Sequence, residues 1–275
     1  MEDMDELGCL SPELTKYANG RLVSMIFTRL RSVLLATAAI GSVAIVPTAE
    51  GQLQLLSNFH PSFYGSAELD TEDSQFYLLG MYAGVAKLGW SPYLNVNAYR
   101  LNYVDRTPGE VERDLSAISP TVGFAYGGRS GGFSFGGGYT WTDSEDSGAP
   151  GAEGGGSSGP HAAFGAYQNG RGDRPWRVQF LSNYNFGAEY VWTRLRATTA
   201  LTDRVRAGAE LIGQGGFEEG SGSNVFKVGP TVEVAWSDSF RTGAVVGWKT
   251  SGGDRFGDDR ESGVYFKLEF SFSPF

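Results

Sequence analysis

Apolar and polar side chains alternate with a period of two along most of the chain after residue 60. The clearest example is residues 264–272, where Val, Phe, Leu, Phe and Phe alternate with Tyr, Lys, Glu and Ser. Successive side chains of a β-strand point to opposite faces, so this segment predicts a strand with one apolar and one polar face. The same alternation recurs in 133–141, 176–186 and 226–236, and no segment after residue 60 follows a helical period. The pattern therefore predicts an all-β protein.

About twelve such segments follow one another along the chain, within limits of roughly ten to fourteen. They span approximately residues 62–69, 76–87, 93–104, 116–127, 132–142, 161–169, 176–186, 188–200, 204–214, 224–236, 240–250 and 263–273. Each is close to the roughly 9–11 residues that a tilted transmembrane strand requires. The connections after even-numbered segments are mostly short and those after odd-numbered segments are mostly long, as in bacterial outer-membrane barrels. We therefore expect a transmembrane antiparallel up-and-down β-barrel with both termini on the periplasmic side.

Tryptophans near the ends of the expected strands favour a membrane barrel. Trp141, Trp176, Trp236 and Trp248 lie there on the apolar face, as the aromatic girdles of such barrels do, and the chain ends in Phe275. A soluble periplasmic β-sandwich would also combine alternating strands with a signal for export, and it stays open as an alternative.

The first fifty residues predict targeting rather than fold. Arg29 and Arg31 precede a short apolar stretch at 32–46, and a small-residue cleavage pattern ends at Gly51, which together are typical of a secretory signal peptide. The acidic segment before Met25 is unlike the start of a signal peptide, so Met25 is the expected initiator. The predicted organisation is an N-terminal extension at 1–24, a signal peptide at 25–51 and an outer-membrane barrel at 52–275.

Composition narrows the possible functions. With 22 basic and 31 acidic residues the formal charge is −9, which argues against a nucleic-acid partner. One cysteine and two histidines give no basis for a disulfide or a histidine-rich metal site, and no cofactor is expected. His161 is expected in solvent at the outer rim, and no spacing of Ser, His and carboxylate predicts a catalytic centre. We therefore expect no enzyme, with an outer-membrane lipid hydrolase as a less favoured alternative.

Charged residues form two groups on the expected barrel. The first group faces the lumen and comprises Arg194, Arg196, Arg204, Arg206, Glu210, Lys227, Glu233, Lys249, Lys267 and Glu269. The second group is acidic, lies in the outer loops and comprises Asp143, Glu145, Asp146, Glu218, Glu219, Asp254, Asp258 and Asp259. In the hairpin around 201–203 we expect Arg196 opposite Arg206, Glu210 within reach of Arg194 or Arg196, and a wall of net positive charge. The first group is either a structural network of ion pairs or a basic pore lining that guides anions or sugars.

Five segments of the chain carry a resemblance to a known family: Phe76–Gly80, Tyr190–Arg196, Arg206–Glu210, Lys227–Gly229 and Ser262–Tyr265. Together they resemble the BcsS-like cellulose biosynthesis proteins of Gram-negative bacteria. The resemblance implies an outer-membrane barrel that is an accessory of exopolysaccharide biosynthesis or export; a general small porin is the alternative function. The expected partners are outer-membrane lipid and lipopolysaccharide, the barrel-assembly machinery and, for the accessory function, a polysaccharide.

Overall fold

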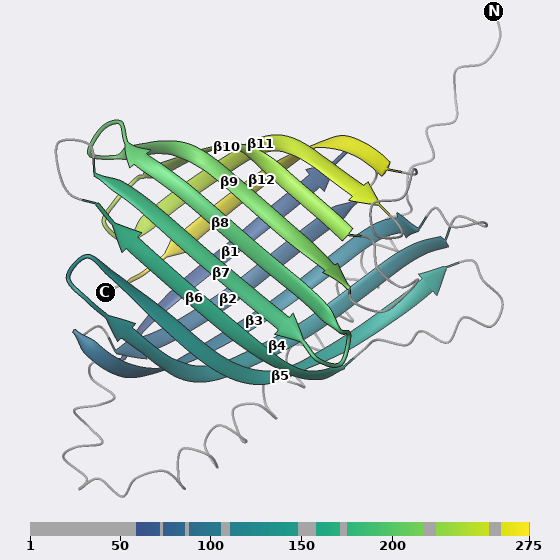
Figure 1. Cartoon of the computed structure of the whole chain (residues 1–275), viewed down its shortest axis with the longest axis horizontal. Coiled ribbons are helices and arrows are strands. Elements are labelled where there is room, and N and C mark those ends of the chain that lie inside the picture. The colour runs from purple at the N-terminus through teal and green to yellow at the C-terminus, as the bar shows by residue number, and fades with distance from the viewer. Residues whose placement is uncertain are drawn as a thin grey trace, which may run out of the picture. The chain divides into compact units, whose positions relative to one another are not determined.

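The structure is a computed structural model that describes residues 59–71, 74–85, 88–105, 111–147, 158–170, 175–216, 224–252 and 260–274. These residues form twelve strands (Figure 1). The strands are β1 (Phe59–Asp70), β2 (Gln75–Val85), β3 (Gly89–Asp105), β4 (Val111–Gly127), β5 (Gly131–Ser147), β6 (Gly159–Asn169), β7 (Trp176–Asn185), β8 (Tyr190–Ala200), β9 (Val205–Gly216), β10 (Asn224–Ala235), β11 (Phe240–Gly252) and β12 (Arg260–Phe272). No helix in the described part of the chain has the length and apolar character needed to cross a membrane.

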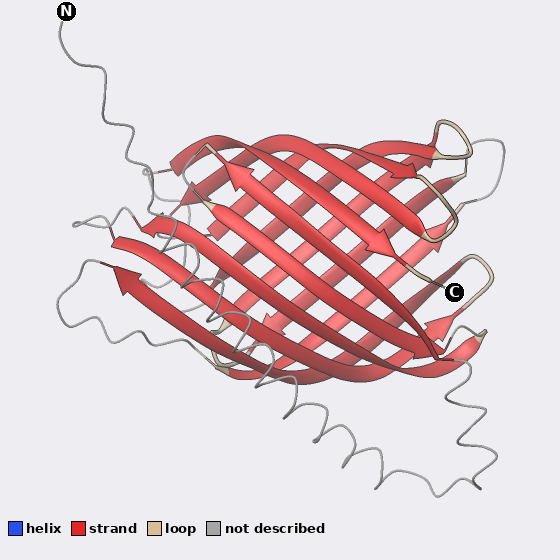
Figure 2. Ribbon diagram, turned by 180° about the vertical axis from the view of Figure 1, so that it is seen from behind, coloured by secondary structure: helices blue, strands red, loops and turns tan. Residues whose placement is uncertain are grey.

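Each strand pairs antiparallel with its neighbours in sequence, and β1 closes the sheet by pairing with β12. Figure 2 shows the strands side by side in the barrel wall. The closing register places Phe63 opposite Phe272 and Asp70 opposite Tyr265. The prediction of an all-β, antiparallel up-and-down barrel of about twelve strands is confirmed. Closure leaves no unpaired sheet edge, which is the condition for a β-structure to sit in lipid.

The predicted N-terminal extension and signal peptide lie outside the described residues, as do Glu218, Glu219, Asp254, Asp258 and Asp259. The prediction that Asp143, Glu145 and Asp146 belong to an outer loop is wrong, because β5 runs on to Ser147. Strands β3, β4 and β5 have 17 residues each, whereas the other strands have 10 to 13. Residues 143–146 continue the pairing of β5 with β4, so backbone hydrogen bonding extends the hairpin beyond the aromatic part of the strand.

The period-two pattern sorts side chains between the two faces of the barrel wall. In β12 the aromatic and aliphatic residues from Val264 to Phe272 point outward and are exposed, whereas Tyr265, Lys267 and Glu269 point into the lumen. Tyr265 is 0% exposed, so the interior on this side is packed with side chains. The molecule is thus apolar outside and polar inside, the reverse of a soluble β-sandwich.

Candidate functional site: the barrel lumen

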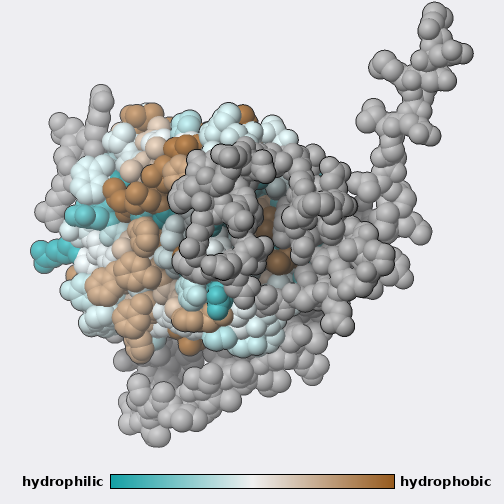
Figure 3. Space-filling view, turned by 45° about the vertical axis from the view of Figure 1, so that its right-hand side comes forward, coloured by the Kyte–Doolittle hydropathy of each residue, from teal (hydrophilic) through white to brown (hydrophobic). Residues whose placement is uncertain are grey.

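The outer surface carries aromatic residues at both ends of the barrel. Near the short turns, the Trp90 ring contacts Tyr126 and Phe133 edge-on, each with a centroid separation of 5.4 Å. Near the opposite end, the Tyr139 and Trp141 rings lie 5.0 Å apart. Between the two groups the surface is aliphatic and aromatic, and Figure 3 shows tan and brown side chains spread over the side of the barrel. An apolar band between two aromatic girdles is the surface that a membrane-spanning barrel presents to lipid.

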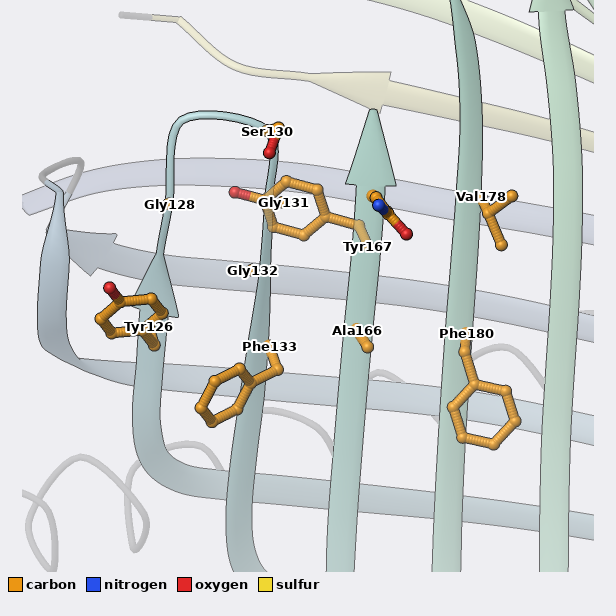
Figure 4. A pocket seen from close by; sticks show the side chains of 11 residues that line it. Tyr126, Gly128, Ser130, Gly131, Gly132, Phe133, Ala166, Tyr167, Val178 and Phe180 are labelled. Atoms are coloured by element: carbon orange, nitrogen blue, oxygen red, sulfur yellow. The ribbon is translucent and has the colours of Figure 1, made fainter. Parts of the chain in front are cut away.

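A shallow groove of about 500 Å³ interrupts this outer surface over β5–β7 (Figure 4). It lies where Gly131 and Gly132 contribute no side chain, and its walls include Phe133, Val178 and Phe180. The groove is lined mainly by apolar side chains of the outer face, together with Gly132 and Tyr167, so it offers little polar chemistry, and the candidate site is the lumen.

One part of the lumen, which we call the charged wall, is formed by inward residues of β8–β12 and β1. Its members are Glu68, Asp70, Arg194, Arg196, Glu210, Lys227, Glu233, Lys249, Lys267 and Glu269. Arg196 is at the centre. Its Nε donates to Glu210 Oε2 at 2.9 Å, its Nη1 to Glu233 Oε1 at 3.1 Å, and its Nη2 to Glu269 Oε2 at 2.5 Å.

The same carboxylates bind the other cations of this centre. Lys267 forms an ion pair with Glu210, and the Arg194 guanidinium donates to Glu269 Oε1 at 3.2 Å. Arg194, Arg196 and Lys267 therefore meet Glu210, Glu233 and Glu269, and the formal charges cancel. The expectation of a net positive wall is wrong at the centre of the charged wall, because carboxylates from β10 and β12 reach across to the arginines of β8.

Two further ion pairs join β1 to strands that it does not border. Lys227 of β10 pairs with Glu68, and Lys249 of β11 donates to Asp70 Oδ2 at 2.6 Å. Lys227 also lies over the Tyr265 ring, 5.7 Å from its centroid. These contacts bridge strands across the interior and fill this side of the lumen. Glu210, in the middle of them, is 0% exposed.

The opposite part, which we call the small-residue wall, is formed by inward residues of β4–β6. Its members are Ala117, Ser119, Thr121, Gly123, Ser134, Gly136, Gly138, Thr140, His161, Ala163 and Gly165. Tyr93 of β3 lies over Gly136, where an added Cβ would come within 2.4 Å of the tyrosine hydroxyl oxygen. Glycine is required there because the tyrosine ring occupies the space of a side chain.

His161 belongs to this wall, and the expectation that it is solvated at the rim is wrong. It is 3% exposed, with Nε2 2.8 Å from the Thr121 hydroxyl and Nδ1 3.0 Å from the Thr140 hydroxyl. Ser119 completes the group, 2.7 Å from Thr140. The imidazole contacts the hydroxyls of Ser119, Thr121 and Thr140, an arrangement that satisfies a buried histidine without a carboxylate.

Between these two walls, β1–β3 contribute tyrosines and amides. The Tyr64 hydroxyl donates to Asn95 Oδ1 at 2.7 Å and also contacts Asn97, and Tyr82 stacks on Tyr93 with ring centroids 5.4 Å apart. Tyr64 also interacts electrostatically with Arg194 of the charged wall. Tyr64 of β1 thus faces the charged wall across the lumen.

Three arginines lie inward at the short-turn end, below the charged wall. We call Arg177, Arg206 and Arg241 the mouth arginines. Arg177 Nε donates to Asn169 Oδ1 at 3.2 Å, and Arg206 Nη2 donates to the Pro175 carbonyl at 2.9 Å.

The structure places all of the expected lumen residues on the inner face except Arg204, which is exposed in the turn between β8 and β9. The expected pairing of Arg196 with Arg206 is wrong. Arg196 lies opposite Glu210, and Arg206 lies opposite Ala200. Glu210 does reach Arg196, as expected.

The sequence did not predict that Arg177 lies near Arg206 at the short-turn end, nor that His161 is buried. The alternation in 176–186 placed Arg177 on the polar face, which was the available signal. Nothing in the local pattern around His161 distinguishes it from a solvated residue, because its partners come from two other strands.

No protein-family model and no curated protein matches the chain. Among solved structures, the chain is similar to the KdgM porin, at 9% identity over 77% of this chain and 98% of that one with a TM-score of 0.41. It is also similar to the transport unit of the autotransporter AIDA-I from Escherichia coli, at 11% identity over 84% of this chain and 94% of that one with a TM-score of 0.47. A third is the translocator domain of the autotransporter NalP from Neisseria meningitidis, at 10% identity over 91% and 97% with a TM-score of 0.42. At these identities the likeness concerns the barrel fold alone, and the resemblance to BcsS-like proteins gains no support.

Proposed function

We propose that the protein is a non-enzymatic outer-membrane barrel that forms a narrow channel for small polar solutes and favours anions. The location is supported by the closed sheet, the apolar outer face and the aromatic groups at both ends. A barrel of this kind buries its backbone hydrogen bonds within the wall and needs no helix to cross lipid.

The observation that carries the channel is the asymmetry of the lumen. The long side chains of the charged wall bind to one another and to β1, whereas the small-residue wall carries Gly, Ala, Ser and Thr over three strands. We place the passage beside β4–β6, where the inward side chains are smallest, although Tyr93 and His161 cover part of this wall and Ala117, Thr121 and Thr140 are buried.

We infer that water enters the interior at the short-turn end of this wall. Tyr167 of β6 lies opposite Gly132 and its ring covers that glycine on the inner face. The tyrosine is nevertheless 42% exposed and also lines the groove over β5–β7, so protein atoms do not enclose it at this end. Neutral ion pairs at the centre and arginines at the mouth then favour entry of anions over cations.

Planar-bilayer recording of the purified barrel tests the proposal. The wild type should give stable conductance steps and a reversal potential in a salt gradient that shows anion preference. Ser134→Trp places a large ring on the small-residue wall and should reduce the single-channel conductance several-fold. Phe135→Trp, one residue along the same strand, points to lipid and serves as the matched control.

A wild type that folds but stays silent would overturn the channel, as would equal conductance in Ser134→Trp and the wild type. A folded, silent barrel would make an accessory function in exopolysaccharide export the better proposal. That function now rests only on the resemblance of segments such as Tyr190–Arg196 to BcsS-like proteins.

A further inference from the structure

The mouth arginines stand on alternate strands at the same end of the barrel. Arg177 is one residue into β7, Arg206 is one residue into β9, and Arg241 is one residue into β11. The strand register fixes their cross-strand neighbours: Arg177 lies opposite Thr198, and Arg206 lies opposite both Ala200 and Glu233. All three are on the face that points into the lumen.

Arg177 has the other two mouth arginines in its electrostatic surroundings. Arg177 is within electrostatic range of both Arg206 and Arg241. Arg206 leans toward β7 and β8, because its Nε donates to the Thr198 hydroxyl at 3.2 Å and its Nη2 to the Pro175 carbonyl at 2.9 Å. Neutral groups therefore hold two of the three side chains in place without cancelling their charge.

Acidic groups do not compensate this cluster among the described residues. Glu233 lies opposite Arg206 and within electrostatic range of Arg177, and its Oε1 accepts from Arg196 at 3.1 Å, so this one carboxylate faces more than one mouth arginine while paired elsewhere. Asp203 and Asp238 lie exposed in turns at the same end, and neither forms an ion pair with a mouth arginine. Three cations thus lie on the inward face at the entrance of the lumen, on alternate strands.

We propose that Arg177, Arg206 and Arg241 form a binding site for a polyanionic solute that carries phosphate or carboxylate groups. Guanidinium groups match the planar, paired oxygens of both groups, and several of them together select for multiple charges over a single one. The site rests on the proposed function only in that the lumen must admit the solute. The inward orientation of the arginines favours a solute over a lipid headgroup, which would approach from the outer face.

Calorimetric titration with tripolyphosphate at low ionic strength, on the folded barrel in a nonionic detergent, tests the site. The wild type should bind, and Arg177→Gln combined with Arg206→Gln should weaken binding at least about tenfold, because two charge-assisted contacts are lost. Arg204→Gln is the matched control. It removes the same charge from the same end of the barrel, but from an exposed turn, and should leave the affinity unchanged.

Absence of binding to the wild type would overturn the site, and so would an equal loss in Arg204→Gln. Should the double variant not fold, Arg241→Gln decides, because Arg241 is exposed and its removal leaves the wall intact: a weaker affinity supports the site and an unchanged one refutes it. Repeating the titration in nanodiscs with and without anionic lipid separates the sources. Competition by the lipid would show a headgroup site instead of a solute site.

The outcome is separable from that of the channel. A barrel that is silent in a bilayer but binds tripolyphosphate through Arg177 and Arg206 keeps the site and loses the channel. A conducting barrel whose binding does not depend on these arginines keeps the channel and loses the site.

Discussion

The charged wall and the small-residue wall solve the same problem in opposite ways. Both lie on the inside of one barrel, where a polar group without a partner is costly. The charged wall fills its space with long side chains and pairs them across the lumen, as Arg196 does with three glutamates. On the small-residue wall, side chains of neighbouring strands fill the space above the small residues. His161 and three hydroxyls form hydrogen bonds with one another there.

The difference predicts which kind of substitution destabilises each wall. Each charged group of the charged wall depends on a partner from a distant strand, so removal of one group leaves its partner buried and unpaired. The small-residue wall depends on side chains small enough for their neighbours to pack closely, so an added side-chain atom collides with those neighbours. The following substitutions separate the two, with unfolding in urea measured in phospholipid vesicles by the fluorescence of the six tryptophans.

The largest effect is expected at the centre of the charged wall. Glu210→Ala leaves Arg196 and Lys267 buried without the carboxylate that both contact, and the free energy of unfolding should fall by about 4 kcal/mol. Asp143→Asn, at an exposed carboxylate of β5, should change it by less than about 0.5 kcal/mol. A similar small change at both positions would show that water already solvates the centre.

The Lys227–Glu68 pair tests two explanations of its effect on stability. Either the attraction between the two charges stabilises the barrel, or the barrel is destabilised only when one charge is left without the other. Lys227→Met alone leaves Glu68 buried and should cost about 3 kcal/mol. The double variant Lys227→Met, Glu68→Leu removes both charges and should recover most of that loss. If the double variant is as unstable as the single one, the charged wall contributes through attraction between the two groups rather than through the avoidance of a lone charge.

On the small-residue wall, the addition of one methyl group is the informative change. Gly136→Ala brings a Cβ against the Tyr93 hydroxyl and the Val122 carbonyl oxygen, the latter at 2.6 Å, and should cost about 2 kcal/mol. Gly137→Ala, the next residue on the opposite face, meets only the His161 carbonyl oxygen at 3.3 Å and should cost clearly less. Equal effects would mean that β-propensity rather than the close approach of Tyr93 decides the cost.

The smallest effect is expected at His161. His161→Phe keeps the ring volume but removes the hydrogen bonds to Thr121 and Thr140, and should lower the free energy of unfolding by about 1 kcal/mol. His161→Gln retains a donor and an acceptor and should recover part of it. A loss well above this value in both variants would place His161 among the residues that hold the barrel closed.

Much of the barrel was predictable because the alternation of apolar and polar residues is a local signal. Each of the twelve expected segments overlaps an observed strand, and Trp176, Trp236 and Trp248 lie on the exposed outer face as expected. The extension of β5 to Ser147 was not predictable in the same way. Residues 143–146 are polar on both faces, and only their pairing with β4 makes them strand.

The hairpin between β8 and β9 shows why the site was harder to predict. The expected turn is centred near Leu201, whereas the observed pairing is centred on Asp203, so that Arg196 faces Glu210 instead of Arg206. The cause is local: Thr202 Oγ1 accepts hydrogen bonds from the backbone N–H groups of Arg204 and Val205 and holds a longer turn. A shift of two residues in the centre of a turn moves each pairing by four, which keeps every side chain on its face but changes its neighbour.

The sequence by itself determined the class of fold, the approximate number of strands and, Arg204 excepted, the face on which each expected lumen charge lies, because a strand turns successive side chains to opposite sides whatever surrounds it. Only the tertiary structure decided which charges meet. Lys249 and Asp70 are 179 residues apart in the chain and come together because β1 closes on β12 and because the barrel interior is narrow enough for a lysine to cross. Closure likewise decided that the arginines at the centre are neutralised and that those at the mouth are not, since the carboxylates that matter come from strands far away in sequence.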